Sequence, residues 1–185
     1  MTDEELVLLA RQGDPDAFDQ LVIRHQSAVY RAALAALRVP QDAEEVAQDA
    51  FVRAWSHLGR FRGDSSFKTW LLTITWNQAM SRRRSLSGWF RRAVAIDETV
   101  DPPDAGRSPH GAAQDAELER QARQTIQALS PTLRDALLLA QTGEHSYEEI
   151  GVMLKVPVGT VKWRVSEARR KVRLQLVTIG YVDAR

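Results

Sequence analysis

Hydrophobic residues recur at helical spacing along almost the whole chain, and no stretch sustains the strict alternation of a half-buried strand. After Pro15, mostly apolar positions three and four residues apart form one face (Phe18, Leu21, Val22, His25, Val29 and Ala32). A second such face follows the break at "VPQDAEE" (Val46, Ala47, Ala50, Phe51, Ala54, Trp55 and Leu58). Because amphipathic helices bury such faces against one another, the pattern predicts an all-α fold.

Helix start signals stand where the periodic segments begin. Two pairs of residues have the spacing of a capping box (Thr2 with Glu5, and Ser146 with Glu149). Asp14 before Pro15 is typical of an N-cap followed by the first helical residue, and Asp42 is placed to cap the next helix. A fourth helix is predicted to begin at Ser65 or Ser66 and to end at the three consecutive arginines.

A change of composition divides the chain. Residues 85–114 show no sustained period and are interrupted by proline and glycine (Gly88, Pro102, Pro103, Gly106, Pro109 and Gly111). A structureless stretch of this length is unusual inside one compact domain. We therefore predict two small helical domains, at 1–84 and 115–178, joined by a flexible linker at 85–114 and followed by a tail at 179–185.

Composition excludes several classes of protein. The chain of 185 residues is 44% hydrophobic and contains no cysteine, which excludes disulfides and thiolate metal sites. Its longest apolar runs, such as "LVLLA" and "ALLLA", are much shorter than the ~20 residues that span a bilayer. The acidic start "MTDEEL" lacks the features of a secretory signal. We expect a cytoplasmic protein that does not insert into membranes.

An enzyme is the first alternative. The four histidines are scattered without metal-ligand spacing (His25, His57, His110 and His145). The chain also lacks a glycine-rich phosphate loop and a nucleophile elbow. We therefore expect no catalytic residues, no metal and no cofactor.

The C-terminal part has the pattern of a helix-turn-helix. A short helix "YEEIGVML", a turn near Val156 and Pro157, and a longer helix from Thr160 to about Leu176 share apolar positions (Ile150, Leu154, Val161, Val165, Ala168 and Val172). The segment from Val152 to Gln175 contains seven cationic residues and one acidic residue, Glu167. The pattern favours binding in the major groove through the residues at the start and along the outer face of the longer helix (Thr160, Lys162, Trp163, Arg164, Ser166, Glu167, Arg169 and Arg170). A helical hairpin that binds protein is the alternative.

The stretch "FRGDSSFKTWLLTITWNQAMSRRR" combines aromatic residues, one amide and a block of cations. The spacing predicts an inward face (Phe67, Trp70, Leu71 and Ile74) and a separate line along the same helix, with Trp76 beside it (Thr73, Asn77, Met80 and Arg84). Asn77 offers a donor and an acceptor to a base edge. The RGD tripeptide is interpreted as loop chemistry, with Gly63 at a tight bend, because adhesion would require export.

Two segments resemble extracytoplasmic-function (ECF) sigma factors of bacteria. "DAEEVAQDAFVRAWSHLGRFRGDSSFKTWLLTITWNQAMSRRR" resembles their second conserved region, and "LSPTLRDALLLAQTGEHSYEEIGVMLKVPVGTVKWRVSEARRKV" resembles their fourth. The resemblance covers both helical blocks and leaves out mainly the linker and the tail. Trp163 stands where the family often has serine or threonine, and Glu167 where arginine is frequent. An acidic side chain accepts from cytosine, so the usual minus-thirty-five preference is not expected to hold.

The resemblance implies roles for particular residues. A pocket for an unpaired base of the minus-ten element would be formed by the loop and the following helix, with arginines on phosphates (Phe61, Arg62, Gly63, Asp64, Ser65, Trp70, Thr73, Asn77, Arg82, Arg83 and Arg84). An acidic face would dock on the clamp helices of the β′ subunit of RNA polymerase (Asp42, Glu45, Gln48 and Asp49). The implied partners are the polymerase core, including its β subunit, promoter DNA and an anti-sigma factor.

The sequence leaves two alternatives to these roles open. The acidic face is also typical of a solvated helix surface, and the resemblance alone favours docking. A free-standing helix-turn-helix regulator would bind duplex DNA without polymerase, but it would not need the N-terminal block of aromatic residues, Asn77 and arginines. The linker, by the same resemblance, would pass through the polymerase toward its active centre.

Overall fold

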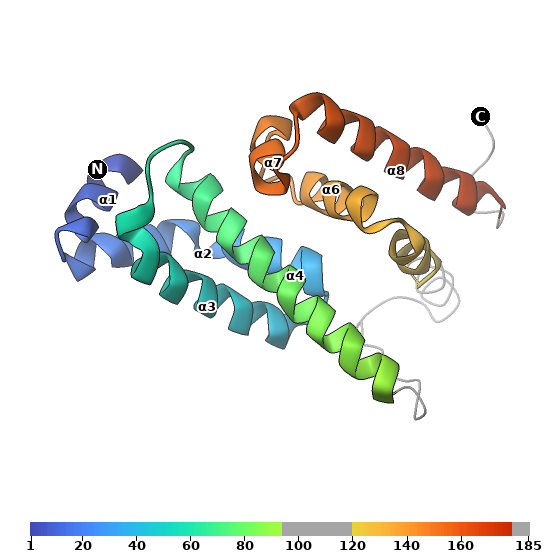
Figure 1. Cartoon of the computed structure of the whole chain (residues 1–185), viewed down its shortest axis with the longest axis horizontal. Coiled ribbons are helices and arrows are strands. Elements are labelled where there is room, and N and C mark those ends of the chain that lie inside the picture. The colour runs from blue at the N-terminus through green and yellow to red at the C-terminus, as the bar shows by residue number, and fades with distance from the viewer. Residues whose placement is uncertain (94–119, 179–185) are drawn as a thin grey trace, which may run out of the picture.

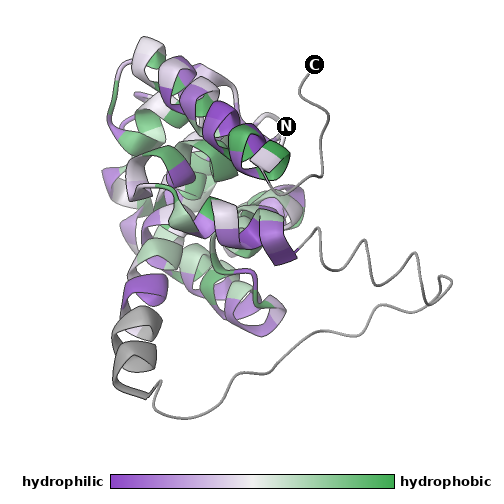
Figure 2. Cartoon of the chain, turned by 90° about the vertical axis from the view of Figure 1, so that its right-hand side faces the viewer, coloured by the Kyte–Doolittle hydropathy of each residue, from purple (hydrophilic) through white to green (hydrophobic). Residues whose placement is uncertain are grey.

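The computed structural model of the chain describes residues 1–93 and 120–178, with backbone alone at 86–93. Over these residues the regular elements are helices, which confirms the predicted all-α class. They form an N-terminal group and a C-terminal group that lie side by side (Figure 1). The helices carry both hydrophobic and hydrophilic positions (Figure 2), as the amphipathic patterns predict.

The N-terminal domain is a helical bundle. It contains α1 (Asp3–Arg11), α2 (Pro15–Leu37), α3 (Pro40–His57), a 3-10 turn (Leu58–Arg60) and α4 (Phe67–Ala93). Helix α2 packs against both α3 and α4, and α3 packs against α4. These three helices therefore enclose one apolar core.

The predicted caps fix where three of these helices begin. Thr2 and Glu5 exchange the two hydrogen bonds of a capping box at 2.8 and 3.3 Å. The Asp14 carboxylate accepts from the first backbone N–H groups of α2. Ser66 accepts from the backbone N–H of Thr69 at 3.1 Å and so caps α4. Each cap satisfies a donor that the helix itself leaves unpaired.

Three sequence-based expectations for this domain are wrong. Asp42 does not cap α3, because the helix begins at Pro40 with Val39 at the cap position. Trp55 was expected on the inward face of α3 but is 42% exposed at the edge of the core. Its ring centroid lies 4.9 Å from that of Phe18. Helix α4 does not end at the arginines but continues to Ala93, so the chain is not structureless from residue 85. The rest of the predicted linker, 94–114, lies outside the described residues.

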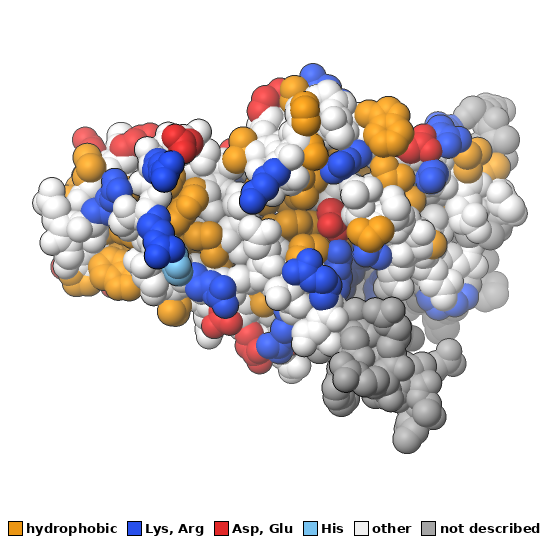
Figure 3. Space-filling model, viewed as in Figure 1, with side chains coloured by type: hydrophobic (Ala, Val, Ile, Leu, Met, Phe, Trp, Pro, Cys, Tyr) orange, Lys and Arg blue, Asp and Glu red, His pale blue; other side chains and the backbone are white. Residues whose placement is uncertain are grey.

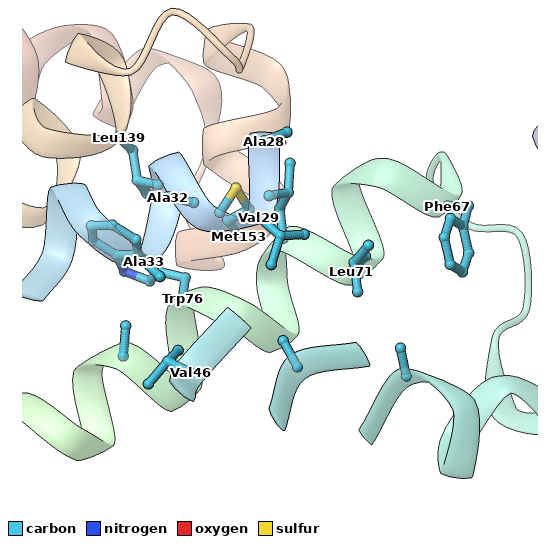
Figure 4. Close-up of a cluster of buried hydrophobic side chains, with 14 of the residues drawn as sticks. Ala28, Val29, Ala32, Ala33, Val46, Phe67, Leu71, Trp76, Leu139 and Met153 are labelled. Atoms are coloured by element: carbon cyan, nitrogen blue, oxygen red, sulfur yellow. The ribbon is translucent and has the colours of Figure 1, made fainter. Parts of the chain in front are cut away.

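Buried side chains of α4 fill the centre of the N-terminal bundle. One run of the helix is almost fully enclosed (Phe67, Leu71, Leu72, Thr75, Trp76 and Ala79). The facing positions on α2 and α3 are mostly alanine and valine, which lets the helices approach closely (Figure 4). The orientation of α4 about its own axis is thereby fixed.

The C-terminal domain confirms the helix-turn-helix pattern. Residues 120–128 are helical, followed by α6 (Pro131–Gln141), α7 (Tyr147–Leu154) and α8 (Val158–Thr178). The apolar positions of α7 and α8 that were predicted to pack together are buried or half-buried. Helix α8 begins at Val158, slightly before the predicted start.

The two domains share an apolar interface. Helix α4 lies against α7, and α2 lies against α6. Leu139 of α6 and Met153 of α7 are buried and approach Val29, Ala32 and Trp76 in the N-terminal core (Figure 4). Apolar burial therefore holds the two domains together in this structure.

The turn of the helix-turn-helix requires glycine at position 151. A Cβ built on Gly151 would lie 2.8 Å from the backbone oxygen of Val156, which cannot move without breaking the turn. We expect Gly151→Ala to lower the free energy of unfolding by about 1–3 kcal/mol, the usual cost of overpacking. Gly159→Ala is the matched control, because that position faces open space. Equal urea midpoints for the two variants would contradict this assignment.

Candidate nucleic-acid interface

A groove of about 730 Å³ runs between α3 and α4. Four of the predicted minus-ten residues line it (Trp70, Asn77, Arg82 and Arg84). Asn77 is exposed and Trp70 is half-buried, so an amide and an aromatic ring both reach this groove. Cations gather on this face of the molecule (Figure 3). A concave surface with these groups can hold a flat polar ring beside a phosphate chain.

Sequence reasoning missed part of the groove. Arg53 and His57 of α3 and Arg60 of the 3-10 turn also line it, together with Asp49. Arg53 and His57 are four residues apart, so they share a helix face, and that spacing is visible in the sequence. The sequence does not show that this face is set against Asn77.

The predicted loop stands beside the groove rather than in its lining. Phe61 packs in an aromatic cluster with Phe67 and Trp70, with ring centroids 5.2 to 6.0 Å apart. Gly63 has φ +80°, which explains glycine at this bend. Arg62 and Asp64 are exposed and Ser65 is half-buried. The cluster thereby fixes the plane of the Trp70 ring.

Two residues beside Asn77 on α4 belong to the core. Trp76 is 2% exposed and Met80 is 8% exposed, so neither can meet a ligand from solvent. Thr73 is half-buried and donates its hydroxyl to the Thr69 carbonyl at 2.8 Å. The predicted reading line of α4 is therefore carried mainly by Asn77.

The three consecutive arginines have different surroundings. Arg82 contacts Asp42 at 2.6 Å and Glu45 at 2.8 Å, and the hydrogen bond that it donates to Asp42 raises the pKa of Arg82. Arg83 donates to Asp135 of α6 at 2.8 Å. Arg84 lines the groove. Arg82 and Arg84 therefore line the groove, whereas Arg83 is held by the C-terminal domain.

The residues of the predicted polymerase-binding face also differ in exposure. Glu45, Gln48 and Asp49 are exposed along α3, whereas Asp42 is half-buried against Arg82. Glu45 also contacts Arg82, so Asp49 and Gln48 are the more accessible members of the set. The role of this face stays a prediction.

Helix α8 presents the predicted duplex-binding residues. Lys162, Trp163, Ser166, Arg169 and Arg170 are exposed, while the others are half-buried (Thr160, Arg164 and Glu167). Trp163 is 63% exposed, which is unusual for so large an apolar side chain.

Glu167 is engaged within α8. Arg170 donates to both of its carboxylate oxygens at 2.8 Å, and this contact lowers the pKa of Glu167. The two side chains therefore form one bidentate unit on the outer face. Acceptance of a hydrogen bond from cytosine by Glu167 stays a prediction.

Polar contacts join α4 to the C-terminal domain. Glu144 contacts Arg31 at 2.6 Å and Lys68 at 3.4 Å, and Thr69 donates to Glu149 at 2.8 Å. Burial opposes ionisation of Glu144, but the two cations outweigh it and hold the pKa of that carboxyl below its ordinary value. Charged partners thus reinforce the apolar interface between the domains.

Within 1–93 and 120–178, no three histidine, cysteine, aspartate or glutamate side chains gather closely enough to hold a metal ion. No helix in these ranges is long and apolar enough to cross a membrane.

Comparisons of sequence identify related proteins. The family models "Sigma-70 region 2" and "Sigma-70, region 4" match residues 21–88 and 119–172. The chain is 36% identical to an RNA polymerase sigma-H factor of Pseudomonas aeruginosa, over 92% of this chain and 91% of that protein. It is 37% identical to an ECF RNA polymerase sigma-E factor of Escherichia coli, over 93% of both chains.

Solved structures show the same fold. CnrH in complex with the cytosolic domain of CnrY aligns with a TM-score of 0.69 and 28% identity, covering 95% of this chain and 97% of that one. The sigma factor RpoE in complex with the anti-sigma factor NepR, from Bartonella quintana, aligns with a TM-score of 0.62 and 24% identity. That alignment covers 86% of this chain and 96% of the other.

The hydroxyl of Thr69 supplies one of the contacts between the domains. Thr69→Val keeps the shape but leaves the half-buried Glu149 carboxylate without this donor, which costs about 1–2 kcal/mol and shifts domain closure roughly five- to thirtyfold. Pulsed EPR between spin labels on Ser56→Cys and Gln175→Cys measures the separation of the domains. Thr73→Val is the control, because its hydroxyl bonds within α4. If both variants keep the parental distance distribution, the Thr69 contact does not hold the domains together.

Proposed function

The chain belongs to the extracytoplasmic-function group of RNA polymerase sigma factors, and from this premise we propose how its two domains recognise a promoter. As a sigma factor, it binds core RNA polymerase and directs the initiation of transcription. We propose that the N-terminal domain holds the minus-ten element as unpaired bases, and that the C-terminal domain reads the minus-thirty-five element as duplex. RNA synthesis is carried out by the polymerase, so the chain needs no catalytic residue of its own. We propose that it acts in the cytoplasm.

The groove between α3 and α4 carries this proposal. A base can leave its stack only where another surface replaces the lost contacts and hydrogen bonds. Trp70 offers a ring face and Asn77 offers a donor and an acceptor, and both line the same concave surface. Arg53, Arg60 and Arg84 line it as well and are suited to the phosphates on either side of the base.

Duplex reading is assigned to α8. Its N-terminal part carries exposed Lys162 and Trp163, followed by Ser166 and a cationic stretch. A helix of this kind enters the major groove with its first turns at the base edges and its cations along the phosphates. The apolar ring of Trp163 is suited to a thymine methyl group.

Docking on the polymerase is assigned to the exposed part of the acidic face. Glu45, Gln48 and Asp49 lie on one side of α3, beside the groove that Asp49 also lines. We propose that this side meets the clamp helices of the β′ subunit. The groove would then face the promoter as its strands separate.

Control by an anti-sigma factor is proposed from the related structures. CnrH was solved with the cytosolic domain of CnrY, and the Bartonella quintana RpoE with the anti-sigma factor NepR. A protein of this type would bind the present chain and withhold it from the polymerase.

Run-off transcription from a promoter library tests the function directly. Core polymerase would be assayed alone and with the full chain. We expect a set of transcripts that appears only when the chain is present. Identical transcripts in the two reactions would contradict a sigma factor and would favour a free-standing regulator.

Asp49 tests the docking face. Asp49→Arg places a cation where a basic partner is proposed, and like charges across an interface cost several kcal/mol, so we expect core binding to weaken at least about tenfold. Asp19→Arg makes the same charge change at an exposed position of α2 and serves as the control. Binding would be measured by titration of labelled chain with core polymerase. Equal affinities for the two variants would remove the assignment.

Asn77 tests the capture of an unpaired base. Asn77→Ala removes a contact worth about 1–3 kcal/mol, so we expect promoter opening to fall roughly five- to 150-fold while duplex binding changes little. Permanganate reactivity of the minus-ten thymines in the complex with core polymerase reports opening. Gln26→Ala, an exposed amide on α2, is the control. Reactivity equal to that of the parent chain would exclude this role for Asn77.

A further inference from the structure

The loop between α6 and α7 brings His145 to the contact between the two domains. Its neighbour Glu144 is held by Arg31 of α2 and Lys68 of α4, and Glu149 at the start of α7 is held by Thr69. These bonds fix the loop against the N-terminal domain on both sides of the histidine. The imidazole therefore lies where the domains would part.

Both ring nitrogens of His145 are buried, and neither has a hydrogen-bond partner among the described residues. A neutral imidazole carries one donor and one acceptor, and buried polar groups are usually paired. The domain contact thus leaves the ring nitrogens of His145 without hydrogen bonds, although the nearby Glu144 and Glu149 carboxylates are paired. Water would restore both hydrogen bonds if the domains separated.

The charges that face His145 come from several elements. Glu144 belongs to the same loop, Glu149 to α7 and Lys68 to α4, while Arg31 of α2 reaches the loop through Glu144. Both carboxylates favour an imidazolium, but each already accepts from other groups. Lys68 repels an imidazolium.

Loss of hydration outweighs the attraction of the carboxylates. Burial is the largest influence and lowers the pKa of His145 below its ordinary value, and Lys68 acts in the same direction. The closed arrangement therefore favours the neutral ring. An open arrangement would return the ring to water and to the ordinary pKa of about 6.5.

We propose that His145 makes the contact between the two domains sensitive to pH, so that protonation of its ring opens the closed arrangement of the chain. The direction of the pH effect follows from the difference in proton binding between the open and closed states. The open state binds a proton at a higher pH than the closed state, so acidification through the ordinary histidine range draws the equilibrium toward the open state. Each unit by which the two pKa values differ changes the equilibrium about tenfold.

Opening would change what helix α4 presents. Lys68 and Arg83 are held by Glu144 and Asp135 of the C-terminal domain in the closed arrangement. Separation would release both cations on the helix that also carries Asn77. The inference concerns the free chain and goes beyond the proposed function, because it requires neither polymerase nor DNA.

The experiment measures domain separation in the full chain. The sequence contains no cysteine, so Ser56→Cys on α3 and Gln175→Cys on α8 give two unique sites for a donor and an acceptor dye. Energy transfer would be recorded at constant ionic strength from about pH 8 to about pH 5, where histidine titrates. We expect transfer to fall on acidification, because the ratio of open to closed chains rises.

Two variants identify the group responsible. His145→Leu has an apolar side chain that cannot be charged, so we expect transfer to stay high over the whole range. His57→Leu is the control, because His57 is exposed on α3, and it should keep the parental profile. His25 is 7% exposed and contacts Asp3, and it is present in both variants. Loss of the pH response in His145→Leu alone would therefore exclude His25 as its cause.

A second measurement covers the case in which His145→Leu fails to fold. The ring proton resonances of His145 in the parent chain would be titrated by NMR, and we expect a midpoint below the ordinary histidine value of about 6.5. The proposal is overturned if transfer does not change with pH, or if it rises on acidification. It is also overturned if His145→Leu keeps the parental pH profile, or if the midpoint of His145 is not below about 6.5.

Discussion

The burial of one face of helix α4 is the constraint on which the rest of the structure depends. Leu71, Leu72 and Trp76 are almost fully enclosed, so the helix cannot rotate about its axis without exposing them. With 3.6 residues per turn, Asn77 is then directed out of the core and into the groove that α3 completes. Packing in the core thus positions the amide that we assign to base capture.

The same helix also meets the C-terminal domain. Apolar contacts through Met153 and ion pairs through Lys68 and Arg83 hold α7 and α6 beside it. The groove beside Asn77 lies between α3 and α4 and stays accessible in this closed arrangement. Single-strand capture and domain closure therefore depend on different sides of one helix. That separation would allow closure to be regulated without rebuilding the groove.

Local features were predictable from the sequence, whereas pairings between distant residues were not. The capping boxes, the glycine bend at 63 and the core of the helix-turn-helix each depend on residues a few positions apart. By contrast, Asp42 looks like a cap until Arg82, forty residues later in the chain, is known to contact it. The exposure of Trp55 and the burial of Trp76 likewise depend on which neighbours pack beside them, which apolar periodicity does not specify.

The central claim is that the groove beside Asn77 receives a base from the separated strands of a promoter. A photo-crosslinking amino acid in place of Asn77, in the complex of the chain with core polymerase and promoter DNA, tests it most directly. The account predicts crosslinks to one strand within the melted minus-ten bases. Crosslinks confined to duplex DNA near the minus-thirty-five element, or to protein alone, would contradict it.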